Sequence, residues 1–171
     1  MLPMIKTTVT PGHVLELTRE FAAARELVFR AWTSAEMAKC WWGCNEFPAS
    51  HMEMDARPGG LWRACLRSDD GAEIWLGGEF IEVKSPERLS FTFVRDAAPA
   101  LGVERVETRV TVILTERAGR TLMAFRQESF ASAELRDSHQ TGWSTGFVRL
   151  DGILSETAVV SSHNNLITQT S

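Results

Sequence analysis

The chain has 171 residues, 44% of them hydrophobic and 23% charged, which is typical of one folded domain and excludes a disordered chain. The formal net charge is −4 and no block of basic residues occurs, so we expect no nucleic acid as a partner. No apolar run approaches the ~20 residues that span a bilayer, so no membrane segment is expected either.

The cysteines and the N-terminus favour a reduced compartment. Cys40, Cys44 and Cys65 are odd in number and too few for a disulfide framework, and the chain does not start with the basic and apolar segments of a signal peptide. We therefore expect a cytoplasmic protein, a monomer or a homodimer. The paired spacing of structural zinc sites is missing, as are the glycine patterns of phosphate-binding loops, so no metal and no cofactor are expected.

Three elements are predicted before residue 50. Residues 1–13 are expected to form a polar leader that precedes a domain over 14–156. Apolar and polar residues alternate over 14–21, which predicts a strand. Between 22 and 33 the apolar period becomes that of a helix, and a second short helix over 35–42 is capped by Ser34 and ended by Gly43.

The middle of the chain predicts strands alone. Their expected ranges are 50–57, 61–67, 72–83, 89–95, 103–116 and 121–130, and turn residues separate them. No helical crossover lies between them, so they form an antiparallel meander. Gly77 and Gly78 interrupt one strand, where we expect a bulge or a sharp bend.

A long helix is predicted after the last strand. Its apolar stripe advances by three or four residues through Leu135, His139, Trp143, Phe147, Leu150 and Leu154. From 157 to 171 the chain is small and polar without a period, so we expect a frayed tail there.

Six short motifs follow one another along the chain. They are Arg30-Ala31-Trp32-Thr33, Trp41-Trp42-Gly43, Arg57-Pro58-Gly59-Gly60-Leu61-Trp62, Gly78-Glu79-Phe80-Ile81-Glu82-Val83, Pro86-Glu87-Arg88-Leu89-Ser90-Phe91-Thr92-Phe93, and Gly142-Trp143 followed by Phe147 and Leu150. In this order they resemble the activator of heat-shock protein 90 ATPase homologue-like family of the START and birch-pollen-allergen-like superfamily, and the resemblance covers nearly the whole chain from about residue 15 to 156. Cys44 departs from the family pattern, which usually has proline after the Trp-Trp-Gly turn.

The resemblance implies an α+β helix-grip fold. A curved antiparallel sheet of six to seven strands would wrap around the long C-terminal helix, with two short helices after the first strand and a cavity between sheet and helix. The superfamily contains lipid and hormone carriers, polyketide cyclases and co-chaperones, so the fold alone does not determine the activity.

Tryptophan is the residue type that most favours a binding cavity. Three of the six tryptophans lie between Arg30 and Gly43, and such large rigid side chains build either a ligand-binding wall or an ordinary core. Strand alternation and the helical stripe predict an inner wall of mostly carbon. The expected ligand-binding residues are Trp42, Trp62, Leu66, Trp75, Phe91, Phe93, Val112, Phe125, Gln127, His139, Trp143 and Phe147.

Two polar side chains fall on this otherwise apolar wall. Gln127 is either a hydrogen-bonded core amide or the group that orients a ligand, and the sequence leaves both readings open. His139 is expected to pack at the helix with one hydrogen bond, because no partner for acid–base catalysis can be assigned to it. The chain has no tyrosine, which excludes phenolic chemistry in the cavity.

Three functions remain open at this point. The first is a protein that binds a small, mostly neutral hydrophobic molecule, because an unpaired charge in such a wall costs several kcal/mol, on the order of one desolvated ion. The second is a co-chaperone-like module that stimulates a chaperone ATPase through its outer surface. The third is a cyclase-like or aromatase-like enzyme, for which no catalytic residue can be named.

Overall fold

One antiparallel sheet organises the chain, with strand order β1-β2-β8-β7-β6-β5-β4-β3. The structure is a computed structural model that describes residues 6–9 and 13–168. In chain order the elements are β1 (Lys6–Val9), β2 (Leu15–Phe21), α1 (Arg25–Thr33), α2 (Ala35–Trp41), β3 (Ala49–Met54), β4 (Leu61–Arg67), β5 (Glu73–Lys84), β6 (Arg88–Arg95), a 3-10 turn η1 (Pro99–Leu101), β7 (Val106–Arg117), β8 (Arg120–Glu128) and α3 (Ala133–Thr168). The predicted α+β helix-grip fold is confirmed.

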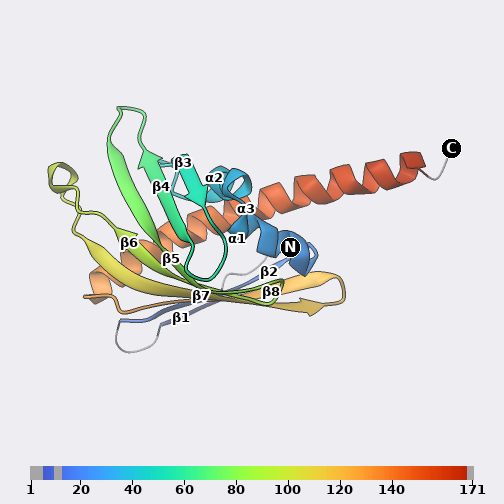
Figure 1. Cartoon of the computed structure of the whole chain (residues 1–171), viewed down its shortest axis with the longest axis horizontal. Coiled ribbons are helices and arrows are strands. Elements are labelled where there is room, and N and C mark those ends of the chain that lie inside the picture. The colour runs from blue at the N-terminus through green and yellow to red at the C-terminus, as the bar shows by residue number, and fades with distance from the viewer. Residues whose placement is uncertain (1–5, 10–12, 169–171) are drawn as a thin grey trace.

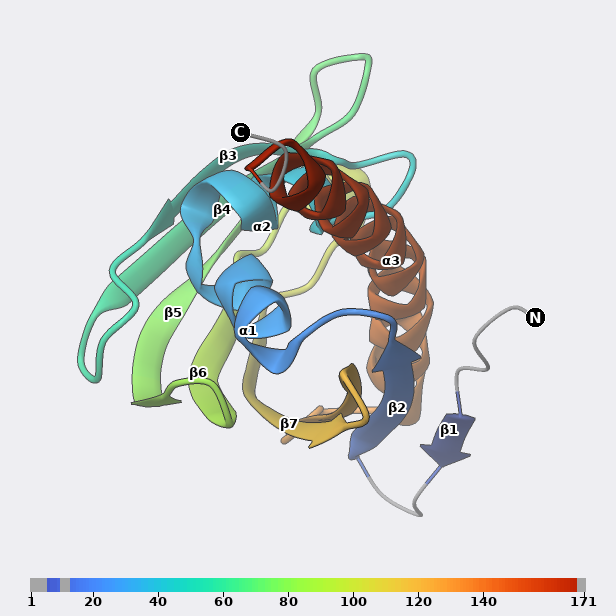
Figure 2. The same cartoon turned by 90° about the vertical axis from the view of Figure 1, so that its right-hand side faces the viewer.

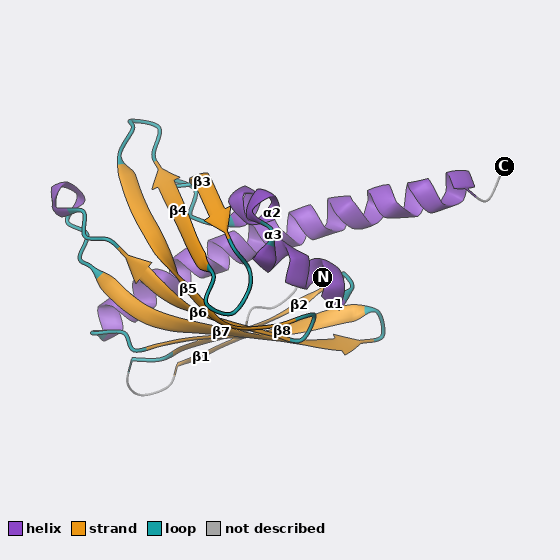
Figure 3. Cartoon of the chain, in the orientation of Figure 1, coloured by secondary structure: helices purple, strands orange, loops and turns teal. Residues whose placement is uncertain are grey.

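The sheet is curved, and the helices lie on its concave side. Figure 2 shows the strands from β3 round to β2 forming a wall around α1, with α3 along the side that the strands leave open. The same grouping of α1, α2 and α3 on one face is seen in Figure 3. Because successive residues of a strand face opposite ways, Val110, Val112 and Leu114 of β7 are all buried while Thr111 and Ile113 between them are not.

The two short helices form as the sequence predicts, and their caps explain the break between them. The Ser34 side chain accepts a hydrogen bond from the backbone N–H of Met37 at 3.3 Å, which satisfies one of the free N–H groups at the start of α2. The backbone then turns at Gly43, whose φ of +88° lies in the left-handed region. The Arg149 guanidinium of α3 donates to the carbonyl of Gly43 and so ties this turn to the long helix.

The long helix crosses the open side of the sheet and continues past it (Figure 1). Its buried stripe includes Phe147, Leu150 and Leu154, as the period of the sequence predicts. Across from them, the buried Arg19 of β2 pairs with Asp151 at 3.4 Å. The prediction of a frayed tail from residue 157 is wrong for residues 157–168, because α3 continues to Thr168. No proline or glycine follows Gly152, so nothing in the sequence breaks the helix there.

Two further predictions need correction. Residues 6–9 of the expected leader form the edge strand β1, which pairs with β2. The expected bulge at Gly77 and Gly78 is also misplaced, since the register of β5 against β6 shifts between Phe80 and Glu82. Gly78 is required for a different reason: a Cβ there would lie 1.9 Å from the carbonyl oxygen of Thr92 on β6.

The core is an aromatic cluster centred on Trp32. This side chain is 1% exposed, and its ring centroid lies 4.7 Å from Trp41, 5.7 Å from Trp143 and 6.2 Å from Phe125. Contacts between aromatic rings at these separations stabilise the fold beyond the contribution of the buried apolar area. Trp32 comes from α1, so the short helix fills the middle of the concave side and leaves space only at one end of it.

Candidate functional site

A cavity of about 280 Å³ lies between the inner face of the sheet and the first half of α3. Its wall is contributed by the segment after α2, by strands β4 to β6, by the loop before β7 and by α3. The lining residues are Trp42, Gly43, Cys44, Phe47, Leu66, Ile74, Leu76, Phe93, Arg95, Val103, Ser138, His139, Gly142 and Trp143. The cavity is open to solvent, because Ser138 is exposed and most of the other lining residues, Arg95 and Val103 among them, are half-buried. Its buried part is formed by Trp42, Leu76, Phe93, His139 and Trp143.

Five of the expected wall residues do line this cavity. Trp42 and Trp143 have ring centroids 5.2 Å apart in an edge-on arrangement, and Phe93 lies 5.8 Å from Trp143. Leu66 adds an aliphatic surface and His139 a polar group. The pair of indoles therefore forms a rigid apolar floor, which a flat guest molecule would contact on its faces.

Six other expected wall residues belong to the packed core and do not line the cavity. They are Trp62, Phe91, Val112, Phe125, Gln127 and Phe147, all of which are buried. The physical reason is Trp32, which the sequence analysis did not place on the wall. Its ring lies 6.2 Å from Phe91 and 6.1 Å from Phe147 and occupies the space that a ligand would need.

The structure decides between the two readings of Gln127. The indole N–H of Trp143 donates to Gln127 Oε1 at 2.8 Å, and Gln127 Nε2 donates to Thr108 Oγ1 at 2.8 Å. Because an indole nitrogen can only donate, the side-chain oxygen of the amide must face Trp143. The Thr108 hydroxyl donates onward to the carbonyl of Phe93 at 3.1 Å. Gln127 is thus a satisfied core amide that orients Trp143.

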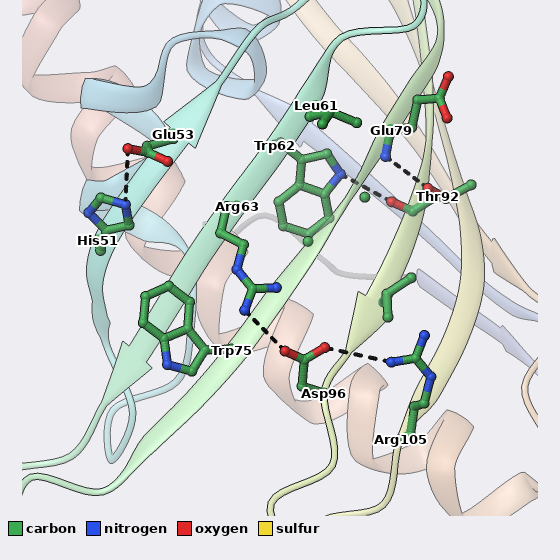
Figure 4. A pocket seen from close by; sticks show the side chains of 13 residues that line it. His51, Glu53, Leu61, Trp62, Arg63, Trp75, Glu79, Thr92, Asp96 and Arg105 are labelled. Carbon is green, nitrogen blue, oxygen red and sulfur yellow. Dashed lines mark hydrogen bonds and ion pairs between the residues drawn. The ribbon is translucent and has the colours of Figure 1, made fainter.

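Trp75 is the one expected wall residue on the opposite face of the sheet. Ile74 and Leu76 beside it face inward and line the cavity, so alternation sends Trp75 outward. There it borders a groove of about 790 Å³ over β3 to β6, drawn in Figure 4. Gly77, two residues after Trp75 on the same outward row of β5, adds no side chain to the floor of this groove. The Arg63 guanidinium lies 4.8 Å from the Trp75 ring centroid.

Both arginines of this outer groove already have carboxylate partners within the protein. Arg63 pairs with Asp96 at 3.1 Å, and Asp96 also faces Arg105 at 3.7 Å, as the dashed lines in Figure 4 show. The Trp75 indole N–H donates to the Glu73 carboxylate at 3.1 Å. A groove with such internally matched charges has little electrostatic reason to take up a small ligand.

His139 is held as a neutral ring at the cavity wall. Its Nδ1 lies 2.9 Å from the carbonyl oxygen of Leu135, so Nδ1 carries the proton and Nε2 is free to accept. Burial lowers the pKa of His139 to about 4, helped by the nearby positive charge of Arg95 and opposed by the hydrogen bond to Leu135. Among the described residues that line the cavity none is acidic, so His139 has no carboxylate partner for acid–base catalysis.

Arg95 is a residue of the cavity wall that the sequence analysis missed. It follows Phe91 and Phe93 on the inward row of β6 and is the charged residue among those lining the cavity. Burial lowers the pKa of its guanidinium, and the negative charge of exposed Glu104 opposes this effect. Counting by two from Phe91 would have placed it on the inner face.

Comparisons with known proteins agree with this architecture. The family model described as "Activator of Hsp90 ATPase homolog 1-like protein" matches residues 22–155. A crystal structure of a Rhodobacter sphaeroides protein matches with a TM-score of 0.77 and 26% identity, over 90% of this chain and 99% of that one. The AHSA1 protein from Silicibacter pomeroyi matches with a TM-score of 0.72 and 24% identity, over 84% of this chain and 99% of that one.

Two further comparisons bear on the whole chain. A solution structure of an Arthrobacter aurescens protein has a TM-score of 0.76 at 22% identity, over 88% of this chain and 91% of the other, which supports the fold alone. No curated protein matches the sequence.

In the part of the chain that the structure describes, none of the helices combines the length and hydropathy needed to cross a bilayer.

Proposed function

Because the chain belongs to the Activator of Hsp90 ATPase homolog 1-like family, we propose that it binds a small, largely apolar molecule in the cavity beneath α3. The observation that carries the proposal is the cavity itself: the rest of the concave side is filled by aromatic rings, yet this end is not. Most of its wall is carbon, with few polar groups, as in typical small-molecule sites.

The volume limits the size of the guest. A cavity of about 150 Å³ is large enough for benzene, so about 280 Å³ accommodates a one-ring or two-ring aromatic molecule or a short aliphatic chain. A steroid or a long-chain lipid would have to displace part of the wall. The flat indoles of Trp42 and Trp143 favour an aromatic guest over a branched one.

A glycine on α3 offers a direct test of the cavity. Gly142 lines the cavity, and a Cβ added there meets nothing within 4 Å. Gly142→Leu should therefore fill the space without a clash and stabilise the helix, since glycine is unfavourable in a helix interior by about 1 kcal/mol. We expect the wild type to bind neutral naphthalene-sized probes, seen as quenching or a shift of tryptophan emission, and the variant to lose that response.

Gly152→Leu is the matched control. Gly152 is an exposed glycine of the same helix, also with nothing within 4 Å of an added Cβ, but it does not line the cavity. This variant should gain similar helix stability and keep the binding response. If both variants bind the probes as the wild type does, the cavity is not a binding site and the proposal fails.

A second candidate follows from the family description, which names an activator of the Hsp90 ATPase. The surface that would serve it is the outer groove, which contains Trp75 and the 68% exposed Leu61. The discriminating experiment measures ATP hydrolysis by an Hsp90 homologue with and without this protein. Stimulation that is lost in Leu61→Ser but kept in Gly142→Leu would favour this function over small-molecule binding.

A further inference from the structure

The cavity has an apolar interior and a single cationic group at its open end. Arg95 contributes that charge, and no acidic side chain is among the described residues of the wall. Of the described carboxylates, Asp96 lies next to it in sequence but pairs with Arg63 and Arg105 on the outer face. The exposed Glu104 carboxylate acts on Arg95 at longer range, but no described carboxylate lies within 4.0 Å of the guanidinium, so the half-buried cation forms no direct ion pair.

The hydrogen-bonding capacity of this guanidinium is only partly used. A guanidinium has five N–H donors, and Arg95 Nη2 donates to the backbone carbonyl of Glu104 at 3.1 Å. Nε of Arg95 has no partner among the described residues, and neither has the indole N–H of Trp42, which is buried. These two buried atoms are donors, and the remaining N–H groups of the Arg95 guanidinium match a ligand that supplies acceptor oxygens, whereas Nε2 of His139 is an acceptor.

From this arrangement we propose that the natural ligand is a small aromatic or aliphatic carboxylate, held with its apolar body against the floor formed by Trp42 and Trp143 and its carboxylate on Arg95. This inference deepens the proposed function and rests on it. A carboxylate fits the fork of a guanidinium with two parallel hydrogen bonds, which a neutral hydroxyl cannot make. Arg95 then acts as the specificity-determining residue of the cavity, in place of Gln127, which is committed to the core.

The charge also determines which end of the ligand enters first. The half-buried Arg95 and the exposed Ser138 lie at the open end, whereas the indoles lie deeper. A carboxylate at the open end keeps part of its hydration and avoids the full cost of burying an ion. A dianionic or zwitterionic guest would leave a second charge unmatched against the apolar wall, so the inferred class is limited to monoanions.

The test compares two probes of the same shape, 1-naphthoate and 1-naphthalenemethanol, by titration calorimetry at neutral pH. The wild type should bind the carboxylate about 10- to 100-fold more tightly, the range expected for a hydrogen bond to a charged group. Arg95→Gln should bring this ratio close to one while leaving the affinity for the alcohol unchanged. Arg95→Lys should keep part of the preference, because it retains the charge without the fork.

Arg109→Gln is the matched control. Arg109 is an exposed arginine of β7, so the variant removes one positive charge without touching the cavity, and it should keep the full preference. If Arg95→Gln does not fold, NMR of the wild-type protein provides the test. The Nε–Hε resonance of Arg95 should shift on addition of naphthoate and should not shift on addition of the alcohol.

Each outcome has a distinct meaning. If both probes bind the wild type equally, or if Arg109→Gln abolishes the preference as fully as Arg95→Gln does, the carboxylate assignment is overturned and the cavity function stands. If the preference survives in Arg95→Gln, the anchor is elsewhere and the inference is likewise overturned. If neither probe binds, the proposed function fails, and the carboxylate assignment falls with it.

Discussion

Burial of His139 should make the protein less stable as the pH falls from neutral to about 4. The ordinary pKa of 6.5 applies to the unfolded chain, whereas burial lowers the pKa in the folded protein to about 4. The folded state therefore binds fewer protons than the unfolded state within this window, and its free energy of unfolding decreases as the pH decreases. Above about pH 6.5 and below about pH 4 this residue contributes no further change.

The magnitude follows from the same two values. The interval between 6.5 and about 4 corresponds to about 3 kcal/mol at 1.36 kcal/mol for each tenfold change in proton affinity. Solvent screens this free-energy contribution little, because His139 is only 8% exposed. A loss of this size is a large share of the 5–15 kcal/mol that roughly spans the stability of single domains.

His139→Asn removes the titrating ring while keeping an N–H near the position of Nδ1, where it can still donate to Leu135. Urea unfolding between pH 4 and 7.5 should show that the variant loses about 3 kcal/mol less than the wild type over this range. Carboxylates titrate in both proteins, so the difference between the two curves isolates His139.

The control for this experiment is His51→Asn, which removes an exposed histidine of β3. Its curve should keep the loss of about 3 kcal/mol toward pH 4, because His139 is still present in this variant. A direct check is the NMR titration of the His139 ring. A midpoint near 6.5, or parallel stability curves for wild type and His139→Asn, would refute the reasoning.

Three further changes, at Gln127, Gly78 and Trp32, probe the packed core, and a fourth at Gly152 serves as a control. Gln127→Leu leaves the Trp143 indole N–H without its acceptor and should cost about 1–3 kcal/mol in urea unfolding, with a shifted tryptophan emission. Gly78→Ala should destabilise severely or prevent folding, seen as lost near-UV circular dichroism, whereas Gly152→Ala should raise the melting temperature. Trp32→Ala should cost about 3–5 kcal/mol by the same unfolding assay, and a near-neutral result would contradict its central place in the core.

The fold could be predicted because its signals are local and repeated. Turn residues delimit the strands and alternation identifies their inner faces, as with Met123, Phe125 and Gln127 of β8, all of which are buried. The edge strand β1 was not predicted, because its four residues are too few to show the alternation of a strand within a polar segment. The continuation of α3 to Thr168 was not predicted either, because the apolar stripe, on which the prediction relied, ends earlier.

The site was only half predictable, because a cavity depends on which of several large side chains fills a shared space. Sequence periodicity places Trp32, Phe91 and Phe125 on inward faces but gives no distance between them. The structure brings all three within contact, so a ligand cannot lie there. The error at Trp75 was avoidable, since alternation with Leu76 assigns it to the outer face.

The location of the cavity also explains why a charge is tolerated in its wall. If the aromatic core had been hollow, the ligand would have lain deep under α3, where a guanidinium would be fully desolvated at a cost of several kcal/mol. Trp32 fills that region, so the open space is confined to the end formed by the Gly43 turn, the loop before β7 and the first turns of α3. At this end Arg95 keeps one hydrogen bond to backbone and part of its hydration. The packing of Trp32, from the short helix α1, therefore limits the size of the ligand and places its polar group next to Arg95.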